Sequence, residues 1–212
     1  NDFAVTVAKT ALWIAESQMM KETEEIVNMT LDFLPLKSYA NIVEGNALRI
    51  DWESVGLKDK LNYIMGNPPF VGARMMSPSQ KSDLLTVFGN QWKNAGNLDY
   101  VACWYKKCTD FIKGTSVRAA LVSTNSVSQG ESVANLWKPL FADGVHIDFA
   151  HRTFRWDSEA SIKAHVHCVI IGFSTAPSSK PKIIFSSERP QIVRNINGYL
   201  LNADNIFVES RK

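Results

Sequence analysis

The chain has 212 residues, of which 45% are apolar and 21% charged, with 11 Gly and 8 Pro. This length fits one domain of roughly 150 residues with some additional chain, and the composition excludes a disordered or collagen-like protein. The 23 basic and 21 acidic residues leave a net charge of +2. A strongly cationic nucleic-acid sleeve is thereby excluded, and any contact with DNA requires a local patch.

The cysteines and the lengths of the apolar stretches indicate which cellular compartment to expect. The three cysteines, Cys103, Cys108 and Cys168, are odd in number and show no CxxC spacing, so neither a disulfide framework nor a zinc ribbon is predicted. We therefore expect a reducing, cytoplasmic location. No apolar stretch approaches the ~18 residues of a membrane span, so no membrane partner is expected. The chain starts at Asn1 and enters a helical pattern almost at once, from which we expect a part of a longer polypeptide.

Apolar spacing in the first third of the chain predicts one helix and two strands. The helix spans 3–20 and turns an Ala-rich face toward a sheet. A β-rich run at 40–48 predicts a strand whose end, at Gly45 and Asn46, opens into a loop. A second strand is predicted over 61–66, and the proline pair that follows must end it.

The rest of the chain predicts an α/β fold. Residues 72–97 form a polar loop insertion of the functional kind, with one modest helix at 79–88. Beyond it, periodicity predicts helices over 98–112 and 130–141 and strands over 117–123, 145–151 and 164–173. This order indicates a mostly parallel sheet with one late antiparallel strand, and active-site loops of such sheets lie past the carboxyl ends of strands. The apolar runs at 183–185 and 206–208 follow a Ser-, Pro- and Lys-rich linker, which suggests that another module begins there.

The most informative motif is the tetrapeptide Asn67-Pro68-Pro69-Phe70 after the strand at 61–66. Each proline keeps the residue before it out of the helical region and offers a carbonyl without an N–H. The result is a rigid corner rich in acceptors. The Asn67 side-chain oxygen and the Pro68 carbonyl together suit both hydrogens of a flat exocyclic amine, and Phe70 offers its face to an aromatic ring. The motif therefore predicts a clamp for an amino group on a planar heterocycle.

Such a clamp has a defined use in methyl transfer. The N6 amine of adenine is a poor nucleophile because its lone pair is delocalised into the ring. Two acceptors relocalise that pair and stabilise the positive charge that grows as the nitrogen attacks an electrophilic methyl group. A base in duplex DNA must leave the helix stack to reach the corner. The alternative interpretation is a strand that simply ends at a Pro-Pro turn, with Asn67 capping its own backbone.

The tetrapeptide with its preceding strand and Gly66 is similar to the fourth motif of amino-methylating, S-adenosylmethionine-dependent DNA methyltransferases. More of the chain resembles one branch of them, the adenine-N6 methyltransferase region of fused type II (type IIG) restriction-modification enzymes. Five further segments in order carry this resemblance: FAVTVAKTALW at 3–13, GNAL at 45–48, NLDYV at 97–101, VSTNS at 122–126 and AHRTFRW at 150–156.

The resemblance implies a partial class I (Rossmann-like) methyltransferase fold. Residues 1–175 correspond to the C-terminal part of the catalytic domain, lacking the first two strands of the sheet, and residues 176–212 to a linker and a candidate start of a target-recognition region. S-adenosylmethionine is the implied cofactor. Its pocket is incomplete, because the family's glycine-rich first motif and ribose-binding acidic residue are absent from the sequence. The implied partners are duplex DNA with a flipped adenine and the remainder of the parent polypeptide, without which we expect no methylation.

The resemblance also assigns catalytic and base-binding roles. Asn67 and Pro68 match the acceptors of the target amine, and Pro69 with the stacking ring of Phe70 completes the catalytic corner. Phe154 matches a second aromatic wall against the flipped base.

Further residues take roles from the same comparison. Trp156 is an alternative candidate for the second aromatic wall. Asn46 matches the residue that reads the amino edge of the cofactor's adenine, with Ala47 beside it in the same motif. Asn97 begins the segment that lines the cofactor pocket, and residues 123–125 support the clamp from the next loop.

Two other clusters allow more than one interpretation. Arg152 belongs to a small basic group with His151, Arg155 and Lys163, which either contacts phosphates flanking a flipped base or forms an ordinary solvated loop. Alternate histidines in the strand at 164–173 invite a metal interpretation, but converging ligands with suitable spacing are missing. We expect no metal site at His165, His167 and Cys168.

Two other functions remain open from the sequence. A same-fold methyltransferase acting on RNA or on a protein glutamine uses the same kind of corner. A non-catalytic DNA-binding or scaffold piece retains the corner without turnover.

Overall fold

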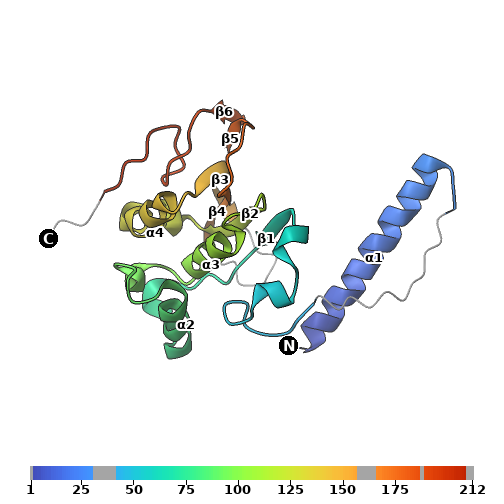
Figure 1. Ribbon diagram of the computed structural model, residues 1–212, viewed down its shortest axis with the longest axis horizontal. Helices are drawn as coiled ribbons and strands as arrows, with labels where there is room; N and C mark the ends of the chain where they lie inside the picture. Colours follow the sequence, from blue (N-terminus) through green and yellow to red (C-terminus); the bar gives the residue numbers. More distant parts are fainter. Residues whose placement is uncertain (1, 31–41, 157–165, 187–188, 209–212) are drawn as a thin grey trace. The chain divides into compact units, whose positions relative to one another are not determined.

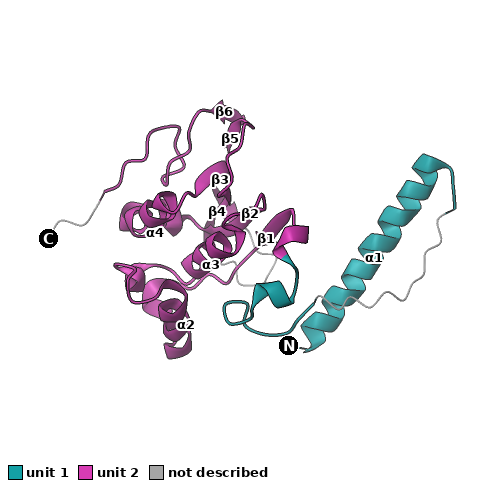
Figure 2. Cartoon of the chain, in the orientation of Figure 1, with its two compact units in different colours: residues 1–57 teal, residues 58–212 magenta. Residues whose placement is uncertain are grey.

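The computed structural model describes residues 2–30, 42–156, 166–186 and 189–208. These fall into two compact units, residues 1–57 and residues 58–212 (Figure 2). None of the helices in the described ranges is both long and apolar enough to span a membrane.

The first unit contains one long helix followed by a turn. Helix α1 (Asp2–Val27) confirms the predicted helix and extends it at its carboxyl end, and none of its residues is buried. Its expected packing face stays a prediction. The strand predicted over 40–48 is wrong for residues 42–48, which have no strand structure, while residues 40 and 41 lie outside the described ranges.

The chain turns at residues 45–50 instead. The Asn46 carbonyl accepts hydrogen bonds from the backbone N–H groups of Arg49 and Ile50, at 2.8 and 3.1 Å. Gly45 adopts a φ of 155°, and a Cβ there would lie 2.6 Å from Ile50 Cδ1. The backbone N–H and C=O groups of a strand need hydrogen-bond partners on a neighbouring strand. The segment at 42–48 instead forms part of its backbone hydrogen bonds within the turn.

The second unit is built around one six-stranded sheet (Figure 1). In spatial order the strands are β1 (Tyr63–Gly66), β2 (Arg118–Thr124), β4 (Val166–Ser174), β3 (His146–Trp156), β5 (Lys182–Phe185) and β6 (Gln191–Val193). The pairs β1/β2 and β3/β5 are parallel, and the other neighbours are antiparallel. Strands β1, β2, β3 and β5 therefore share one direction. The α/β class and the late antiparallel strand, β4, are confirmed.

Three helices accompany the sheet: α2 (Pro78–Phe88), α3 (Ala102–Ile112) and α4 (Gly130–Ala142). Helix α2 begins where predicted because Ser77 and Gln80 form a reciprocal capping box and Pro78 occupies the first turn. Helices α3 and α4 cover one face of the sheet. The Phe173 ring of β4 contacts the rings of Tyr105 and Trp137, with centroids 5.4 and 6.5 Å apart.

Two segments near the carboxyl end differ from the sequence interpretation. Strand β3 continues to Trp156, past a bulge between His151 and Phe154, because β4 runs beside it. His151, Arg152 and Arg155 therefore lie on a strand rather than in a loop. The apolar run at 183–185, set apart by sequence as a candidate new module, forms β5 and pairs with β3. The domain boundary at residue 175 stays a prediction, while residues 206–208 have no regular structure.

Candidate functional site

The candidate site lies at the carboxyl edge of the sheet, as expected for an α/β protein. Strands β1, β2 and β3 run in the same direction, so the segments that leave them emerge at one edge. The Asn67 corner leaves β1, residues 125–128 leave β2, and Phe154 and Trp156 lie at the end of β3.

The corner presents the Asn67 side chain to solvent. Asn67 is exposed, Pro68 is buried and Phe70 is half-buried. Among the residues that the structure describes, none forms a hydrogen bond with the Asn67 side chain. The alternative interpretation, in which Asn67 caps its own backbone, therefore has no bond to support it. The exposed Asn67 amide, on a backbone that two prolines restrict, is open to an incoming planar amine.

The loop after the corner is fixed by backbone hydrogen bonds. The Val71 carbonyl accepts a bond of 2.9 Å from the Tyr100 N–H, and the Ala73 N–H donates to Asp99 Oδ1 at 3.0 Å. The Tyr100 hydroxyl is in turn bonded to the buried Asp83 at 2.7 Å. The segment just before α3 therefore holds the corner's exit.

The segment that leaves β2 is also held in place, by side chains of α3 and α4. Ser123 is buried, and its hydroxyl lies 2.7 Å from that of Tyr105. The next residues enter the short 3-10 helix Asn125–Ser128. Trp137 of α4 donates from its indole nitrogen to the Val127 carbonyl at 2.8 Å. The support expected of residues 123–125 has a structural basis in these contacts, although their link to the clamp stays a prediction.

A polar cavity of about 660 Å³ opens beside these loops. Its lining comes from the corner's exit loop, from the segment before α3, from the segment that leaves β2 and from the start of α4: Ala73, Arg74, Gly96, Asn97, Ser126, Gln129, Gly130, Glu131, Ser132 and Asn135. The cavity falls in the size range of small-molecule sites, about 300–1,000 Å³. Asn97, one of the predicted cofactor residues, is among the lining residues.

An aromatic row follows β3 toward the same edge. The Phe154 ring lies 5.0 Å from the His151 ring and 6.2 Å from the Trp156 ring, centroid to centroid. Phe154 is half-buried, whereas Trp156 is 45% exposed. Phe154 pairs with Cys168, and Cys168 pairs with Thr124 of β2. Two strand spacings, roughly 10 Å, therefore separate Phe154 from Thr124 on the same face of the sheet.

The two predicted cofactor residues of the first unit lie in its turn. The Asn46 side-chain oxygen accepts a bond of 2.9 Å from the Leu48 N–H, so the amide fixes its own turn. The Ala47 carbonyl accepts from the Trp52 indole at 2.8 Å. These bonds hold the turn rigid, and the role of Asn46 toward a cofactor stays a prediction.

Comparison with known proteins decides the family. Residues 1–186 match the family described as MmeI, DNA-methyltransferase domain. The chain belongs to this family. DNA methyltransferase A of Bacillus subtilis (strain 168) is 40% identical over 214 residues, covering 100% of this chain and 24% of that protein. The solved structure of the type IIL restriction-modification enzyme MmeI in complex with DNA is 42% identical with a TM-score of 0.90, covering 100% of this chain and 29% of that one. The chain thus spans about a quarter of these relatives' length.

The family assignment confirms the resemblance to methyltransferases of restriction-modification enzymes. Within this MmeI-type domain, the structure brings Asn67, Phe70, Asn97 and Phe154 into one unit, on loops or strand ends at or near one edge of the sheet. Asn46 and Ala47 belong to the other unit. From the resemblance, Asp99 belongs to the segment 97–100 that lines the cofactor pocket, but sequence reasoning gave it no role of its own.

The cysteines of this MmeI-type domain are structural. Cys103, Cys108 and Cys168 are free and buried. Burial, with a smaller contribution from the charge of Asp83, raises the pKa of Cys103 to about 12. Burial also raises the pKa values of Cys108 and Cys168 above the ordinary value of 9.0. None is therefore a thiolate nucleophile near neutral pH.

The described residues contain no group of three or more His, Cys, Asp or Glu placed to hold a metal ion. Of the residues considered at the sequence level, His165 and Lys163 lie outside the described ranges. His167 is exposed on β4, while Cys168 beside it is buried. Arg152 is exposed on β3, where a contact with a phosphate group stays a prediction.

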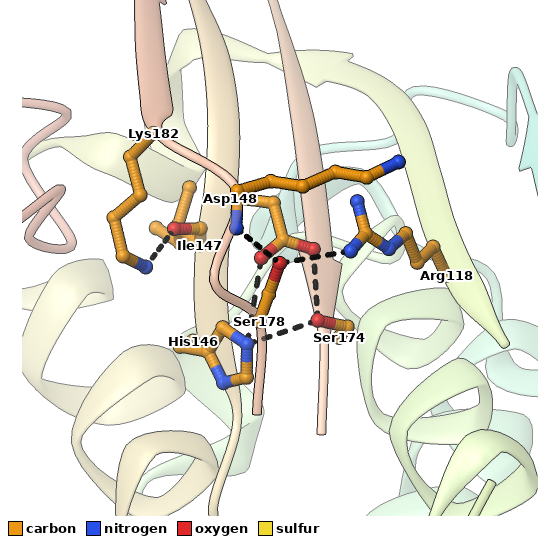
Figure 3. A network of polar contacts seen from close by, with 8 residues as sticks. Arg118, His146, Ile147, Asp148, Ser174, Ser178 and Lys182 are labelled. Atoms are coloured by element: carbon orange, nitrogen blue, oxygen red, sulfur yellow. Dashed lines mark hydrogen bonds and ion pairs between the residues drawn. The ribbon is translucent and has the colours of Figure 1, made fainter. Parts of the chain in front are cut away.

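A second polar cluster lies at the opposite edge of the sheet (Figure 3). The Ser174 hydroxyl donates to Asp148 at 2.8 Å and lies 3.0 Å from His146 Nε2. The same nitrogen is 3.4 Å from the other Asp148 oxygen. A catalytic triad needs the serine and the carboxylate on different ring nitrogens, so this Ser, His and Asp set does not form a hydrolase relay.

The remaining contacts of this cluster join β2, β3 and β5. Lys182 donates to the Ile147 carbonyl, and Arg118 donates to the Ser178 hydroxyl at 2.9 Å (Figure 3). Burial lowers the pKa of Lys182, while the charge of Asp148 acts in the opposite direction. We interpret the cluster as a structural tie at the edge of the sheet away from the corner.

Proposed function

We propose that this MmeI-type domain methylates the N6 amine of an adenine flipped out of duplex DNA, with S-adenosylmethionine as the donor and within a restriction-modification protein. The observation that carries the proposal is the exposed Asn67 amide, without a hydrogen-bond partner among the described residues, at the carboxyl end of β1. A partial class I (Rossmann-like) fold is part of the same proposal, and the strand order around the antiparallel β4 supports it.

Asn67 and Pro68 act on the target amine. The Asn67 side-chain oxygen and the Pro68 carbonyl accept its two hydrogens, and both are preorganised because the prolines restrict the backbone. Acceptors fixed in advance stabilise the developing positive charge without reorganisation, a contribution of about 2.7–4 kcal/mol per group in comparable oxyanion sites. Phe70 stacks against the purine, and Phe154 provides the opposite wall.

The polar cavity supports the cofactor assignment. Its volume of about 660 Å³ and the Asn97 amide in its lining suit part of a small, polar cofactor. For Asn46 and Ala47 of the first unit, the role toward the cofactor's adenine rests on the resemblance alone. S-adenosylmethionine supplies the electrophilic methyl group when bound. The chain's own residues orient the amine toward it, and no strong general base is needed because the proton leaves after the attack.

The choice of DNA as the substrate rests on the family. The related MmeI structure is a complex with DNA, and the aromatic wall and exposed Arg152 at the edge of β3 fit a flipped base with its flanking phosphate. Because the chain is only a part of these relatives, activity has to be tested in the parent protein.

The test compares the parent protein with its Asn67→Ala and Asn67→Asp variants. Plasmid DNA propagated with each is sequenced for N6-methyladenine, and purified proteins are assayed with RNA and protein substrates as well. We expect wild-type modification of DNA, a loss of at least about 100-fold in kcat for Asn67→Ala, and partial activity for Asn67→Asp, which keeps an acceptor.

DNA binding and thermal unfolding of the variants serve as controls, and both are expected to match the wild type. Unchanged methylation by Asn67→Ala would contradict the clamp. Preferential modification of RNA or of a glutamine amide would overturn the DNA assignment. A wild-type parent that binds DNA without methylating any substrate would support the non-catalytic alternative.

A further inference from the structure

Asp99 joins three segments that are distant in the sequence. It follows the 3-10 helix Ala95–Asn97 and precedes α3. Its Oδ1 accepts the Ala73 N–H at 3.0 Å. Its Oδ2 accepts the Thr124 hydroxyl at 3.3 Å and, at a shorter distance, the Ser126 hydroxyl. The carboxylate thus connects the exit of the catalytic corner to the segment that leaves β2.

The pattern of these bonds indicates a geometric role. No Lys, Arg or His within the described ranges forms an ion pair with Asp99, so its charge is met by one backbone N–H and two hydroxyl groups. The two hydroxyls also lie 2.7 Å from each other. Because each has a single proton, they supply two of the three bonds among Thr124, Ser126 and Asp99 at a time. Charge-assisted bonds of this kind are about twice as strong as neutral ones.

The bonds act at two functional features. Ala73 is three residues from Phe70, and both Ala73 and Ser126 line the polar cavity. The neighbouring Tyr100 fixes Val71 through its backbone N–H, so the corner's exit is held at two points. Asp99 therefore connects the loop that follows Phe70, one proposed aromatic wall, to Thr124 of β2. Thr124 lies in the same row of the sheet as Phe154, the other proposed wall.

We propose that Asp99 is a positioning residue that fixes the spacing between the Asn67 corner and the exit of β2. This inference rests on the proposed function. Asp99 acts through Ala73 and through the hydroxyls of Thr124 and Ser126. Because a misplacement of about 1 Å can cost 100-fold in rate, the loss of these bonds lowers the rate of methyl transfer more than it lowers substrate binding.

The experiment measures single-turnover rates of the full-length parent on a duplex carrying its own site, as located by sequencing of modified plasmid DNA. The variants are Asp99→Ala, Asp99→Asn and the matched control Asp110→Ala. Asp110 is 53% exposed on α3 and pairs with Lys106, so its removal takes away a surface ion pair of small energetic value. Single turnover separates the rate of the folded enzyme from the amount that folds.

We expect a fall of about 10- to 100-fold in the methyl-transfer rate for Asp99→Ala, with the dissociation constant for DNA within about threefold of the wild type. Asp99→Asn should stay within about threefold, because its amide oxygen still accepts from Ala73 and its amide N–H₂ donates to hydroxyls that can reverse their roles. Asp110→Ala should match the wild type. With 2-aminopurine in place of the target adenine, Asp99→Ala should give a weaker fluorescence rise on binding, because the flipped base is held less firmly.

If Asp99→Ala does not fold, the variant Thr124→Val with Ser126→Ala removes the Oδ2 bonds alone and should give a smaller fall in the same rate. A wild-type rate in Asp99→Ala, or equal losses in Asp99→Asn and Asp99→Ala, would overturn the proposal. The proposed function fails separately, when the wild-type parent leaves adenine unmodified or when Asn67→Ala is fully active.

Discussion

Phe154 is held by rings on both sides, whereas Trp156 lies at the open end of β3. The His151 ring meets Phe154 nearly edge to face at 5.0 Å, and Trp156 is 45% exposed. We therefore assign the second base-stacking wall to Phe154. Loss of a stacking partner for a base costs about 1–3 kcal/mol.

The variant pair Phe154→Ala and Trp156→Ala tests this assignment. Phe154→Ala should lower the methylation rate by about 10-fold or more, and Trp156→Ala should lower it much less. The measurement is the single-turnover rate on duplex DNA, with Phe154→Tyr as the conservative control. The reverse order of effects would move the wall to Trp156.

Local chemistry explains which site residues could be predicted from the sequence. Pro68 and Pro69 determine the corner through their own backbone restrictions, so Asn67 could be proposed as an acceptor without knowledge of the fold. Asp99 could not, because its partners Ala73, Thr124 and Ser126 lie 25 to 27 residues away along the chain. Its role depends on how β1, β2 and α3 are placed by the sheet.

Gly172 of β4 packs closely against the Phe149 ring of β3. A Cβ at this position would lie 2.1 Å from the Phe149 ring, which covers the glycine on the face away from α3 and α4. Gly172→Ala should lower the free energy of unfolding by about 1–3 kcal/mol, because the buried strand and the ring cannot both stay in place. Urea denaturation measures the change.

Two further variants make this prediction specific. Gly96→Ala introduces the same methyl group where no atom lies within 4 Å, so its effect should be small. Combining Gly172→Ala with Phe149→Leu should recover part of the loss, because the two side chains compete for one space. Additive losses in the double variant would contradict the proposed clash.

The errors in the predicted elements have a common cause. Periodicity described α2 and β2 well because their patterns are local, but it began α3 at residue 98, four residues before its actual start at Ala102. It ended β3 at residue 151, since the bulge before Phe154 breaks the alternation while β4 continues the pairing. It also gave a strand at 40–48, where turn bonds around Asn46 replace a ladder. Strand ends depend on neighbours that a single segment does not reveal.

In the second unit as a whole, strand pairing over a long sequence distance places in the sheet a segment that composition alone would assign to a new module. The Ser-, Pro- and Lys-rich residues after 174 have the composition of a linker. They connect β4 to β5, which pairs with β3 on the side opposite to β4, and β6 pairs with β5 in turn. The family match extends to residue 186, just past β5. The parallel pairing between β3 and β5 cannot be predicted from the sequence of either strand alone.

The pH dependence of folding should reflect the groups that this unit buries. The pKa of Cys103 is raised to about 12, and those of Cys108, Cys168 and Tyr105 are also raised by burial. Above the ordinary thiol value of 9.0, the unfolded thiols lose protons that the folded thiols keep. The free energy of unfolding therefore falls as the pH rises, by about 1 kcal/mol near pH 10 for each of Cys103 and Cys108.

Lys182 contributes in the opposite direction. Its pKa is lowered in the folded protein, so the unfolded state binds more protons between that lowered value and the ordinary 10.5, and this group alone makes stability rise with pH. Urea denaturation of the chain at about pH 8, 9 and 10 should show a net decrease, because several raised groups outweigh one lowered group. The decrease should be steeper in Lys182→Met and shallower in Cys103→Ala. A free energy of unfolding that stays constant or rises across this interval would mean that the thiols of α3 and β4 are not buried as the structure places them.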